Sequence, residues 1–413
     1  MIINADLHIH SHYSTATSDK MTIETLALEA PRKGIHILGT GDCLHPGWMK
    51  EVSACNKIDE GTFELHGTRF LLSAEVEGQR RVHHLLLFPS LSAVEIFRDR
   101  VKSYSKNIDT DGRAHLDLSG ETIASYAQEV GALIGPCHAF SPYTSLYAHH
   151  DSLTDCYGNL TDYVSFLELG LSADSSYADT IDELHRLTYL TNSDCHSSHP
   201  VRLGREFTRF KVHDVTFSQI KNAILRQEGN KPVLNVGFFP QEGKYNESAC
   251  MNCKTHYTLE EATRRRWKCS CGKKIIKGVK DRVAEHASSA EPKPPRHRPP
   301  YTYLIPLSEI IVKAVGQRSP FTKTVTTRWE ELVSTFGTEI TVLLDSDLDD
   351  IARITTPPIV DAIRAFRESR IDIIPGGGGV YGQLVLPTQD KILTVSLGPS
   401  DHQTSLLEYD KET

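Results

Sequence analysis

The chain has 413 residues, enough for two or three domains with at least one well-buried core. Its formal net charge of -8 excludes a generic polyanion binder, so contact with nucleic acid would require a local positive surface. The opening MIINADLHIH lacks the basic flank and apolar core of a secretory signal, and no apolar run approaches the ~20 residues that span a bilayer. The sequence therefore predicts a cytoplasmic protein with no membrane partner.

Residues 1–240 alternate between short apolar strands and amphipathic helices. The predicted strands are INADLHIH, IHILGTGD, RFLLSAEVE, HHLLLFP, ALIGPCHAF, VSFLELGL and LTYLTNSDCH. Helical patterns such as TIETLALEAPRKG and SGETIASYAQEVG separate some of them. This alternation indicates an α/β fold with a mainly parallel sheet, open or closed into a barrel. Folds of this kind place their active sites at the carboxyl ends of the strands.

The first predicted strand carries Asp6, His8 and His10 at alternate positions. Alternate side chains of a strand project from one face about 7 Å apart, so the two imidazoles can hold one or two metal ions. Asp6 lies on the same face, where it can orient a ligand from behind. Taken alone, the pair is equally compatible with half-buried polar residues of an ordinary strand.

Further imidazoles and carboxylates lie at the ends of the later predicted strands. They are Asp42, Glu75, His84, His138, Asp194 and His196. Chance readily supplies one or two such placements, but hardly six. A mixture of imidazole and carboxylate ligands suits zinc, manganese or iron. The sequence therefore predicts a metal centre at the carboxyl ends of the strands.

Two strand neighbours of these residues are expected to face away from the centre. His83 directly precedes His84, and Cys195 separates Asp194 from His196. Because adjacent side chains of a strand point to opposite faces, both lie on the other side of the backbone. Cys195 is predicted to be a small buried residue without a chemical role.

The order of an HxH pair, a GD motif, Glu, His, His and finally DxH resembles the PHP family of metal-dependent phosphoesterases. The resemblance implies a distorted seven-stranded β/α barrel with a two- or three-metal site at its mouth. Divalent ions in such a site lower the pKa of bound water and clamp the non-bridging oxygens of a phosphate ester. The ligands that the resemblance implies are His8, His10, Glu75, His84, His138, Asp194 and His196.

One corner of the implied site departs from the family pattern. The segment that matches the TDH motif of the family reads GDC, so Cys43 stands where the usual histidine would be. We favour Asp42 as the ligand, while Cys43 and His45 remain alternatives. His12 and Asp19 are further candidates to complete the site.

Four of the nine cysteines form two close pairs, in CMNC and CSC. Two such pairs bring four thiolates onto one ion and complete a tetrahedral site. An odd and unevenly distributed set of cysteines also argues for reduced thiols and against a disulfide framework. The sequence predicts a structural zinc ion bound by Cys250, Cys253, Cys269 and Cys271.

Positive charge is concentrated between and after these cysteine pairs. The residues between the pairs are Arg264, Arg265, Arg266, Trp267 and Lys268, and Lys273, Lys274 and Lys277 follow. Basic side chains can contact phosphates, and Trp267 can stack on a base. The competing interpretation is a solvated, charged face. Against the net charge of -8 the cluster stands out, and we predict a contact with DNA.

These observations divide the chain into three predicted domains. Residues 1–240 form the metal-dependent hydrolase domain, residues 241–285 the four-cysteine zinc module, and residues 286–413 a linker followed by a small, DNA-contacting helical domain. AEHASSAEPKPPRHRPP has the composition of a linker, and RWEELVSTFG and PPIVDAIRAFRESR are helical patterns. The glycine run Gly376–Gly379 is included in the helical domain as a flexible turn, or as backbone that approaches DNA phosphates.

A longer pattern resembles the endonuclease Q family over nearly the whole chain. ILGTGDCLHPGW, RRVHHLLLFPS, GPCHAFSPY, TNSDCHSSHP, the cysteine module and IIPGGGGVYG carry the resemblance. It implies a DNA repair enzyme that cuts the phosphodiester 5′ to deaminated bases (uracil, hypoxanthine or xanthine) and to abasic sites. Its metals would be Zn²⁺, with Mg²⁺ or Mn²⁺ as alternatives for catalysis. Its catalytic residues would be His8, His10, Glu75, His138, Asp194 and His196.

A single altered base can be recognised only when it leaves the stack and enters a pocket. We place the pocket between the barrel mouth and the zinc module or tail, with Ser141–Tyr147 and Leu169–Ser176 as candidate walls. Two other functions remain open: a small-molecule phosphoesterase of the histidinol-phosphatase type, and a non-catalytic DNA-binding PHP protein, which Cys43 favours. Recruitment of a sliding clamp is also open, because the acidic end SLLEYDKET contains no clear clamp-binding peptide.

Overall fold

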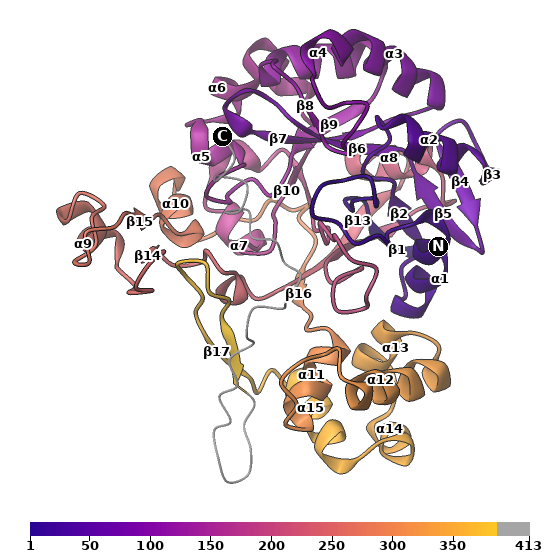
Figure 1. The fold of residues 1–413 in the computed structure, drawn as a ribbon, viewed down its shortest axis with the longest axis vertical. Helices are drawn as coiled ribbons and strands as arrows, with labels where there is room; N and C mark the ends of the chain where they lie inside the picture. Colours follow the sequence, from indigo (N-terminus) through magenta and orange to yellow (C-terminus); the bar gives the residue numbers. More distant parts are fainter. Residues whose placement is uncertain (386–413) are drawn as a thin grey trace.

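The computed structural model describes residues 1–385 and arranges them in three parts (Figure 1). A large α/β body comes first, an arm of short elements projects from one side of it, and a group of helices lies below it. The expectation of a mixed α/β fold with a helical C-terminal region is confirmed. Within the described residues, no helix has both the length and the apolar character needed to span a bilayer. The terminal segment SLLEYDKET lies outside the described residues.

The body contains short strands and eight α-helices. Its strands are β1 (Ile2–Asp6), β2 (Ile37–Gly39), β3 (Asn56–Lys57), β4 (Thr62–Leu65), β5 (Thr68–Leu71), β6 (Ser73–Glu77), β7 (His83–Leu87), β8 (Ala114–His115), β9 (Leu133–Pro136), β10 (Phe166–Glu168), β11 (Thr188–Leu190), β12 (Phe207–Lys211), β13 (Lys231–Gly237) and β16 (Tyr301–Tyr303). Its helices are α1 (Ile23–Lys33), α2 (Pro46–Ser53), α3 (Leu91–Val101), α4 (Gly120–Glu129), α5 (Leu146–His149), α6 (Leu153–Tyr157), α7 (Ser175–Ala178) and α8 (Phe217–Leu225).

Backbone hydrogen bonds join the central strands of the body into a closed ring. β1 pairs with β2, β2 with β5, β6 with β7, β7 with β9, and β10 with β11. Glu75 N donates to Gly41 O at 2.9 Å, and Ala139 N donates to Glu168 O at 3.0 Å, which connects the remaining neighbours. The ring closes where residues beyond β11 meet residues beyond β1: Asp194 N donates to His8 O at 2.9 Å.

The prediction of a mainly parallel sheet is wrong for one side of this ring. β1, β2 and β5 are parallel, as are β10 and β11, but β7 is antiparallel to both β6 and β9. Only residues 78–82 connect β6 to β7, and so short a connection makes a hairpin but cannot return the chain for a parallel strand.

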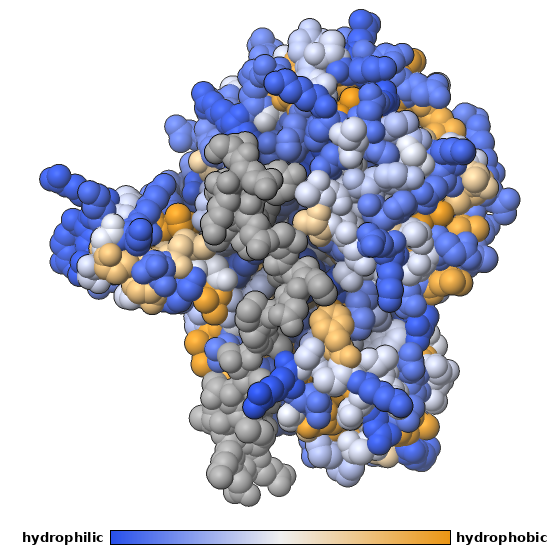
Figure 2. All heavy atoms as spheres, in the orientation of Figure 1, coloured by the Kyte–Doolittle hydropathy of each residue, from blue (hydrophilic) through white to orange (hydrophobic). Residues whose placement is uncertain are grey.

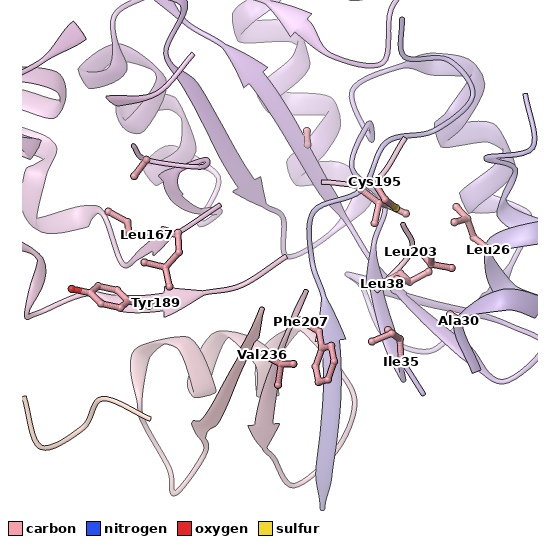
Figure 3. Close-up of a cluster of buried hydrophobic side chains, with 14 of the residues drawn as sticks. Leu26, Ala30, Ile35, Leu38, Leu167, Tyr189, Cys195, Leu203, Phe207 and Val236 are labelled. Atoms are coloured by element: carbon pink, nitrogen blue, oxygen red, sulfur yellow. The ribbon is translucent and has the colours of Figure 1, made fainter. Parts of the chain in front are cut away.

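Two hydrophobic clusters hold the body together, and the larger one continues into the helical region and into α10 (Val279–His286). The smaller cluster takes at least one buried residue from each of β1, β2, β5, β7, β9, β10 and β11 and packs them against α8. The larger cluster includes Leu26 and Ala30 of α1 beside Leu38 of β2 (Figure 3). Cys195 is fully buried in the larger cluster, as expected for a residue facing away from the centre.

The arm comprises β14 (Ala249–Cys250), α9 (Leu259–Arg264), β15 (Ile275–Ile276) and α10 (Val279–His286). A hairpin of β17 (Asp372–Ile374) and β18 (Gln383–Val385) packs against it through the glycine run. A Cβ atom at Gly376 would lie 2.5 Å from Gly243 O, and one at Gly378 would lie 2.8 Å from Cys250 O. The glycine run therefore belongs to this hairpin and not to the helical region, and close backbone packing explains its composition.

The helical region consists of α11 (Leu307–Ala314), α12 (Lys323–Phe336), α13 (Glu339–Leu344), α14 (Leu348–Ile354) and α15 (Pro357–Arg367). A buried ion pair anchors it to α1: Lys33 Nζ lies 2.6 Å from Glu339 Oε1, and both side chains are at most 1% exposed. Glu339 also accepts hydrogen bonds from Leu307 N and Trp329 Nε1, at 3.0 and 2.6 Å. The carboxylate thus fixes two helices and the body at one point.

Replacing Lys33 with alanine is expected to lower the free energy of unfolding by about 3–5 kcal/mol, because it leaves the Glu339 carboxylate buried without its counter-ion. Denaturant unfolding followed by circular dichroism measures the change, with Lys50→Ala on the exposed face of α2 as the matched control. Equal unfolding midpoints for the two variants would contradict the anchoring role of the pair.

Candidate metal centre

His8 and His10 lie just beyond β1, each backed by a carboxylate. His8 Nδ1 donates to Glu168 Oε2 at 2.8 Å, and His10 Nδ1 donates to Asp42 Oδ1 at 3.0 Å. This arrangement fixes both rings and directs each Nε2 atom to the same central space, where a metal ion would replace the Nε2 proton. Burial disfavours protonation of both rings, but the charges of Glu168 beside His8 and Asp42 beside His10 outweigh it and raise their pKa values.

Glu75 of β6 occupies the middle of the cluster. Its Oε1 lies 2.5 Å from His83 Nδ1 and 3.2 Å from His138 Nε2, and its Oε2 lies 3.2 Å from His10 Nε2. Arg113 Nη1 donates to the same Oε2 at 3.1 Å. Although burial alone would raise the pKa of Glu75, the charges of His83 and Arg113 lower it well below its usual range. Glu75 is therefore ionised, and its two oxygens face groups on both sides of the cluster.

Asp194 and His138 face Glu75 from loops that follow β11 and β9. Asp194 Oδ1 lies 3.3 Å from His10 Nε2 and 3.7 Å from His8 Nε2. Both residues adopt left-handed backbone, with φ of 45° at Asp194 and 29° at His138. Such conformations cost about 1–3 kcal/mol each and persist only where the surroundings enforce them. Ten other non-glycine residues among residues 1–385 also have a positive φ, so the strain by itself identifies no site; at these two positions both strained residues contribute side chains to the cluster.

The residues around Asp194 and His138 supply that enforcement. Ser193 N donates to Asp6 Oδ1 at 2.9 Å, and Ser193 O accepts from the Arg205 guanidinium at 2.9 Å. Asp6 contacts no ligand directly, so it orients the centre by holding the loop of Asp194. His138 N donates to Glu168 Oε1 at 3.0 Å, so Glu168 supports His8 and His138 together.

Buried atoms without partners show that the cluster suits metal ions. His8 Nε2, His10 Nε2 and Asp194 Oδ1 are buried, lie within 4.8 Å of one another and make no hydrogen bond. Buried polar atoms without a hydrogen bond are costly, and two imidazole nitrogens and a carboxylate oxygen that converge on one point form the donor set of a divalent cation once the ring nitrogens release their protons. Glu75, His83 and His138 form a second such group within 4.8 Å. A metal cofactor therefore fits the residues present.

The structure brings together His8, His10, Glu75, His138 and Asp194. His196 lies at the rim: its ring centroid is 4.4 Å from that of His10, and its side chain is 34% exposed. Its Nδ1 donates to Asp194 O at 3.1 Å. Burial, followed by the charge of His10, lowers the pKa of His196 to about 4, so the ring is neutral near pH 7 with its Nε2 free to accept.

The prediction that His84 is a ligand is wrong, and His83 takes its place. In the hairpin, His83 pairs with Glu77, so it shares a face with Glu75, whereas His84 pairs with Val76 on the opposite face. His84 Nδ1 lies 2.8 Å from Tyr157 OH, away from the centre. Burial lowers the pKa of His84 to about 3 and keeps it neutral.

Asp42 also lies outside the open centre, behind His10. Its oxygens accept hydrogen bonds from His10 Nδ1, from Ser11 N and Oγ, and from Ser14 Oγ, which leaves no oxygen directed at the central space. The prediction that Asp42 is a direct ligand is therefore corrected to that of a residue orienting His10.

The other candidates at this corner do not reach the centre either. Cys43 is buried in the hydrophobic core, and His45 caps the N-terminus of α2. His12 pairs with Glu51 at 2.9 Å, and Asp19 is exposed.

Sequence reasoning missed three members of the cluster: His83, Glu168 and Arg113. Glu168 lies inside the predicted strand VSFLELGL and ends the observed strand β10. Glu75 lies inside the predicted strand RFLLSAEVE in the same way, so the pattern that selected Glu75 would also have found Glu168. The face of His83 depends on the register of the hairpin. Arg113 lies in an irregular segment before β8, and no sequence pattern marks it.

The four cysteines of the arm converge as predicted. The Sγ atoms of Cys250 and Cys271 lie 3.5 Å apart, those of Cys253 and Cys269 lie 3.3 Å apart, and all four lie within 4.8 Å of one another. A hydrogen bond from Tyr257 OH lowers the pKa of Cys269 to about 5, which favours the thiolate that binds metals. This set can hold one metal ion.

Within the arm, α10 packs on the body through Val279 and Val283, but the part from β14 to β15 has little else to stabilise it. Besides Cys250 and Cys269, its buried apolar cluster contains only Ala262 and Ile275, with Tyr257 and Trp267 packed alongside. So small a core rarely folds without a metal or cross-link.

The basic side chains of the arm are exposed, and hydrophilic residues cover its outer end (Figure 2). Arg264, Arg265, Arg266 and Lys268 all face solvent, and the guanidinium of Arg265 lies 5.5 Å from the ring centroid of Tyr257. Trp267 differs, because it is half-buried against the small core with Lys277 Nζ 4.8 Å from its ring centroid. One face of the indole is therefore covered.

The two neighbouring histidines of β7 give a matched test of the centre. His83→Ala is expected to reduce bound metal and to lower metal-dependent activity by at least ~10-fold, since residues that orient or complete metal sites contribute 10–100-fold. His84→Ala is expected to leave metal content unchanged and to cost about 1–3 kcal/mol of stability by leaving Tyr157 OH unpaired. Plasma mass spectrometry of the purified proteins measures the metal. Loss of metal in His84→Ala alone would reverse the assignment.

One family model and two curated sequence relatives match this chain. The family model described as the MJ0043 C-terminal domain matches residues 306–370. The uncharacterized protein MJ0043 of Methanocaldococcus jannaschii is 43% identical over 289 residues, which cover 67% of this chain but only 35% of that protein. The uncharacterized protein YqxK of Bacillus subtilis is 31% identical over 405 residues, which cover 92% of this chain and 99% of that protein.

Two solved structures are similar over nearly the full length. The crystal structure of the lesion-specific endonuclease PfuEndoQ from Pyrococcus furiosus has 49% sequence identity and a TM-score of 0.89, with 94% of this chain and 96% of that chain covered. Endonuclease Q in complex with a 27-mer duplex carrying an abasic lesion at the active site has 49% identity and a TM-score of 0.90, with 94% and 98% covered. The chain belongs to the endonuclease Q family.

Proposed function

We propose that this protein is a lesion-specific DNA endonuclease that hydrolyses the phosphodiester 5′ to deaminated bases (uracil, hypoxanthine or xanthine) and to abasic sites. The observation that carries the proposal is the enclosed histidine–carboxylate cluster with three buried, unpartnered ligand atoms. The comparison with solved structures supports a DNA substrate, because a family member with 49% identity has been solved with abasic DNA at its active site. Phosphodiester hydrolysis is one of the reactions that such a donor set serves, and the similarity to a lesion-specific endonuclease favours it here.

The ring of strands, in this proposal, is the distorted seven-stranded β/α barrel of the PHP type. The closed circuit of backbone hydrogen bonds supports it, as does the position of the cluster where strands of the ring end. We keep the division into a hydrolase domain (1–240), a zinc module (241–285) and a third part (286–413) with a linker and a DNA-contacting helical domain. Among the described residues of the third part, β16 belongs to the sheet of the body and the β17–β18 hairpin packs against the arm, so the helical domain consists of α11 to α15. Residues 386–413 lie outside the described part. The cytoplasm is the proposed compartment, which suits nine free cysteines.

The catalytic metals are proposed to be divalent, Zn²⁺ or alternatively Mg²⁺ or Mn²⁺. When bound, such ions supply Lewis-acid activation of water and neutralise charge on the phosphate. The residues that would hold or complete the centre are His8, His10, Glu75, His83, His138, Asp194 and His196.

The residues of the chain itself prepare this chemistry. Glu168 and Asp42 orient the imidazoles of His8 and His10, so that their Nε2 atoms need no rearrangement when a metal ion binds. His196 is neutral near pH 7 and stands at the rim, so its free ring nitrogen can accept a hydrogen bond from water beside the substrate.

Lesion selection requires the altered nucleotide to leave the duplex, which costs least where pairing is already weak. The loop after β9 is the best placed of the two candidate pocket walls. Ser141 Oγ lies 3.3 Å from His138 Nδ1, and Tyr143 lies next in the same loop with its ring 5.5 Å from that of Tyr245. The Leu169–Ser176 segment is tied to β16, because Tyr303 OH donates to Asp174 at 2.6 Å.

The proposed reaction is tested with labelled duplexes that contain uracil, hypoxanthine, xanthine, an abasic site or no lesion, in Mg²⁺, Mn²⁺ or Zn²⁺. A nick on the 5′ side that requires the lesion is expected. It should fall by more than ~100-fold in Asp194→Ala, because even residues behind the ligands contribute 10–100-fold. Asp162→Ala, on an exposed turn of the body, is the matched control, and chelator removes the metals.

Two outcomes would overturn the proposal. Release of phosphate from small esters without cleavage of any duplex would indicate a phosphatase of the histidinol-phosphatase type. Lesion binding without cleavage in every metal would indicate a non-catalytic DNA-binding protein.

The arm is proposed to hold a structural zinc ion in its four-cysteine site and to contact DNA phosphates through its basic face. Replacing Arg264, Arg265 and Arg266 together with alanine should weaken binding to DNA of any sequence. The slope of log K against log salt should fall by up to ~0.9 for each phosphate that the arm no longer neutralises. Fluorescence anisotropy at several salt concentrations measures both. Lys50, Lys102 and Lys231, exposed on the body, are replaced together as the control. An unchanged slope would mean that the arginines are only solvated.

A further inference from the structure

Arg113 reaches the metal centre from a loop whose backbone is held by several side-chain hydrogen bonds. Asn107 Nδ2 donates to Arg113 O at 3.0 Å, and its Oδ1 accepts from His115 N at 2.8 Å. One side chain therefore holds the backbone at both Arg113 and His115. Asp111 adds a hydrogen bond to Arg113 N at 3.1 Å. The backbone around Arg113 is thus fixed before any ligand arrives.

Gly112 allows this loop to approach the centre closely. Gly112 N donates to Tyr13 O at 3.1 Å, and a Cβ atom at this position would overlap both Ser14 and Asp42. Any larger residue would push the loop, and Arg113 with it, away from the cluster. The lack of a side chain at Gly112 therefore allows the loop to place Arg113 beside Glu75.

The Arg113 guanidinium has unused hydrogen-bonding capacity. Nη1 donates to Glu75 Oε2 at 3.1 Å, while Nε is buried and has no partner. The side chain is 15% exposed, so it lies inside the wall of the site and close to its opening. A buried guanidinium donor without an acceptor is costly, and an anionic ligand in the site would satisfy it.

Arg113 also stands out by charge. Glu75 and Asp194 face the centre, with Glu168 and Asp42 directly behind the histidines. Among residues 1–385, Arg113 is the one lysine or arginine that forms an ion pair with Glu75 or Asp194. An arginine stays charged at any physiological pH, so this cation is permanent, unlike a metal ion that exchanges with solvent.

We propose that Arg113 contacts the scissile phosphate, holding Glu75 with one N–H group and donating another to a non-bridging phosphate oxygen. This inference rests on the proposed endonuclease function. A planar guanidinium suits a phosphate, because it can offer two parallel donors. It is already in place when negative charge grows on the oxygens, so little reorganisation opposes its effect on the transition state. Arg113 would then be a catalytic residue that contacts substrate directly.

The test compares Arg113→Lys and Arg113→Gln with the wild type in single-turnover cleavage of a lesion duplex. Removing one preorganised donor costs ~100–1,000-fold in rate, and we expect a loss of this size in Arg113→Gln, with partial recovery in Arg113→Lys. Arg100→Gln, an exposed residue of α3, is the matched control and should cleave normally. Metal stoichiometry is measured on the same samples and should be unchanged.

A second substrate separates contact with phosphate from positioning of Glu75. In this duplex a neutral methylphosphonate replaces the scissile phosphate, which removes one charged oxygen. If Arg113 binds that oxygen, the rate advantage of wild type over Arg113→Gln should shrink by at least ~10-fold on the neutral substrate. An advantage of the same size on both substrates, or loss of metal from Arg113→Gln, would overturn the proposal and assign Arg113 to Glu75 alone.

The two proposals fail in different ways. If the wild-type protein cleaves no lesion duplex in any metal, the endonuclease function itself is wrong. If the wild type cleaves and Arg113→Gln cleaves equally well, the function stands and the role of Arg113 is rejected.

Discussion

The metal centre depends on one backbone contact, the pairing of the residues beyond β1 with those beyond β11. Asp194 N donates to His8 O, and His10 N donates to Cys195 O at 3.0 Å. These two hydrogen bonds close the ring of strands across nearly 190 residues of sequence. They also bring the HxH and DxH motifs side by side, so the closure that completes the body assembles its chemistry. Stability and function therefore share the same bonds.

Around this closure the structure arranges carboxylates in two layers. Glu75 and Asp194 face the central space, while Glu168 and Asp42 stand behind the histidines and orient them. Burying so much negative charge is costly unless cations accompany it. Arg113 provides one permanent cation, and bound metals would provide the rest. This charge balance gives a physical reason for an arginine inside a site otherwise made of metal ligands.

The arm and the helical region are attached to the body by different means. The helical region shares the larger hydrophobic cluster with the body and is also joined to α1 by the buried Lys33–Glu339 pair. In the arm, α10 packs into that same cluster through Val279 and Val283, whereas the part from β14 to β15 has a very small core and is supported by its four cysteines and the glycine hairpin. Few apolar contacts and an exposed basic face suit a part that meets a large, charged ligand.

Much of the fold and of the centre could be read from the sequence, because both leave short-range patterns. Alternating strands and helices indicated the α/β body, HxH and DxH at strand ends indicated the histidine–carboxylate cluster, and the paired cysteines indicated the four-thiolate site. Each of these signals depends on the geometry of one strand or one turn, which neighbouring residues determine.

Other features depend on which segments of the chain meet, so they follow only from the tertiary structure. The register of β6 against β7 turned His83 and not His84 towards Glu75. The approach of Ser11 and Ser14 occupied Asp42, and the loop clamped by Asn107 brought in Arg113, which no motif marks. Packing against the arm explained the glycine run. A local pattern specifies which face a side chain occupies, but only the closed ring specifies what that face meets.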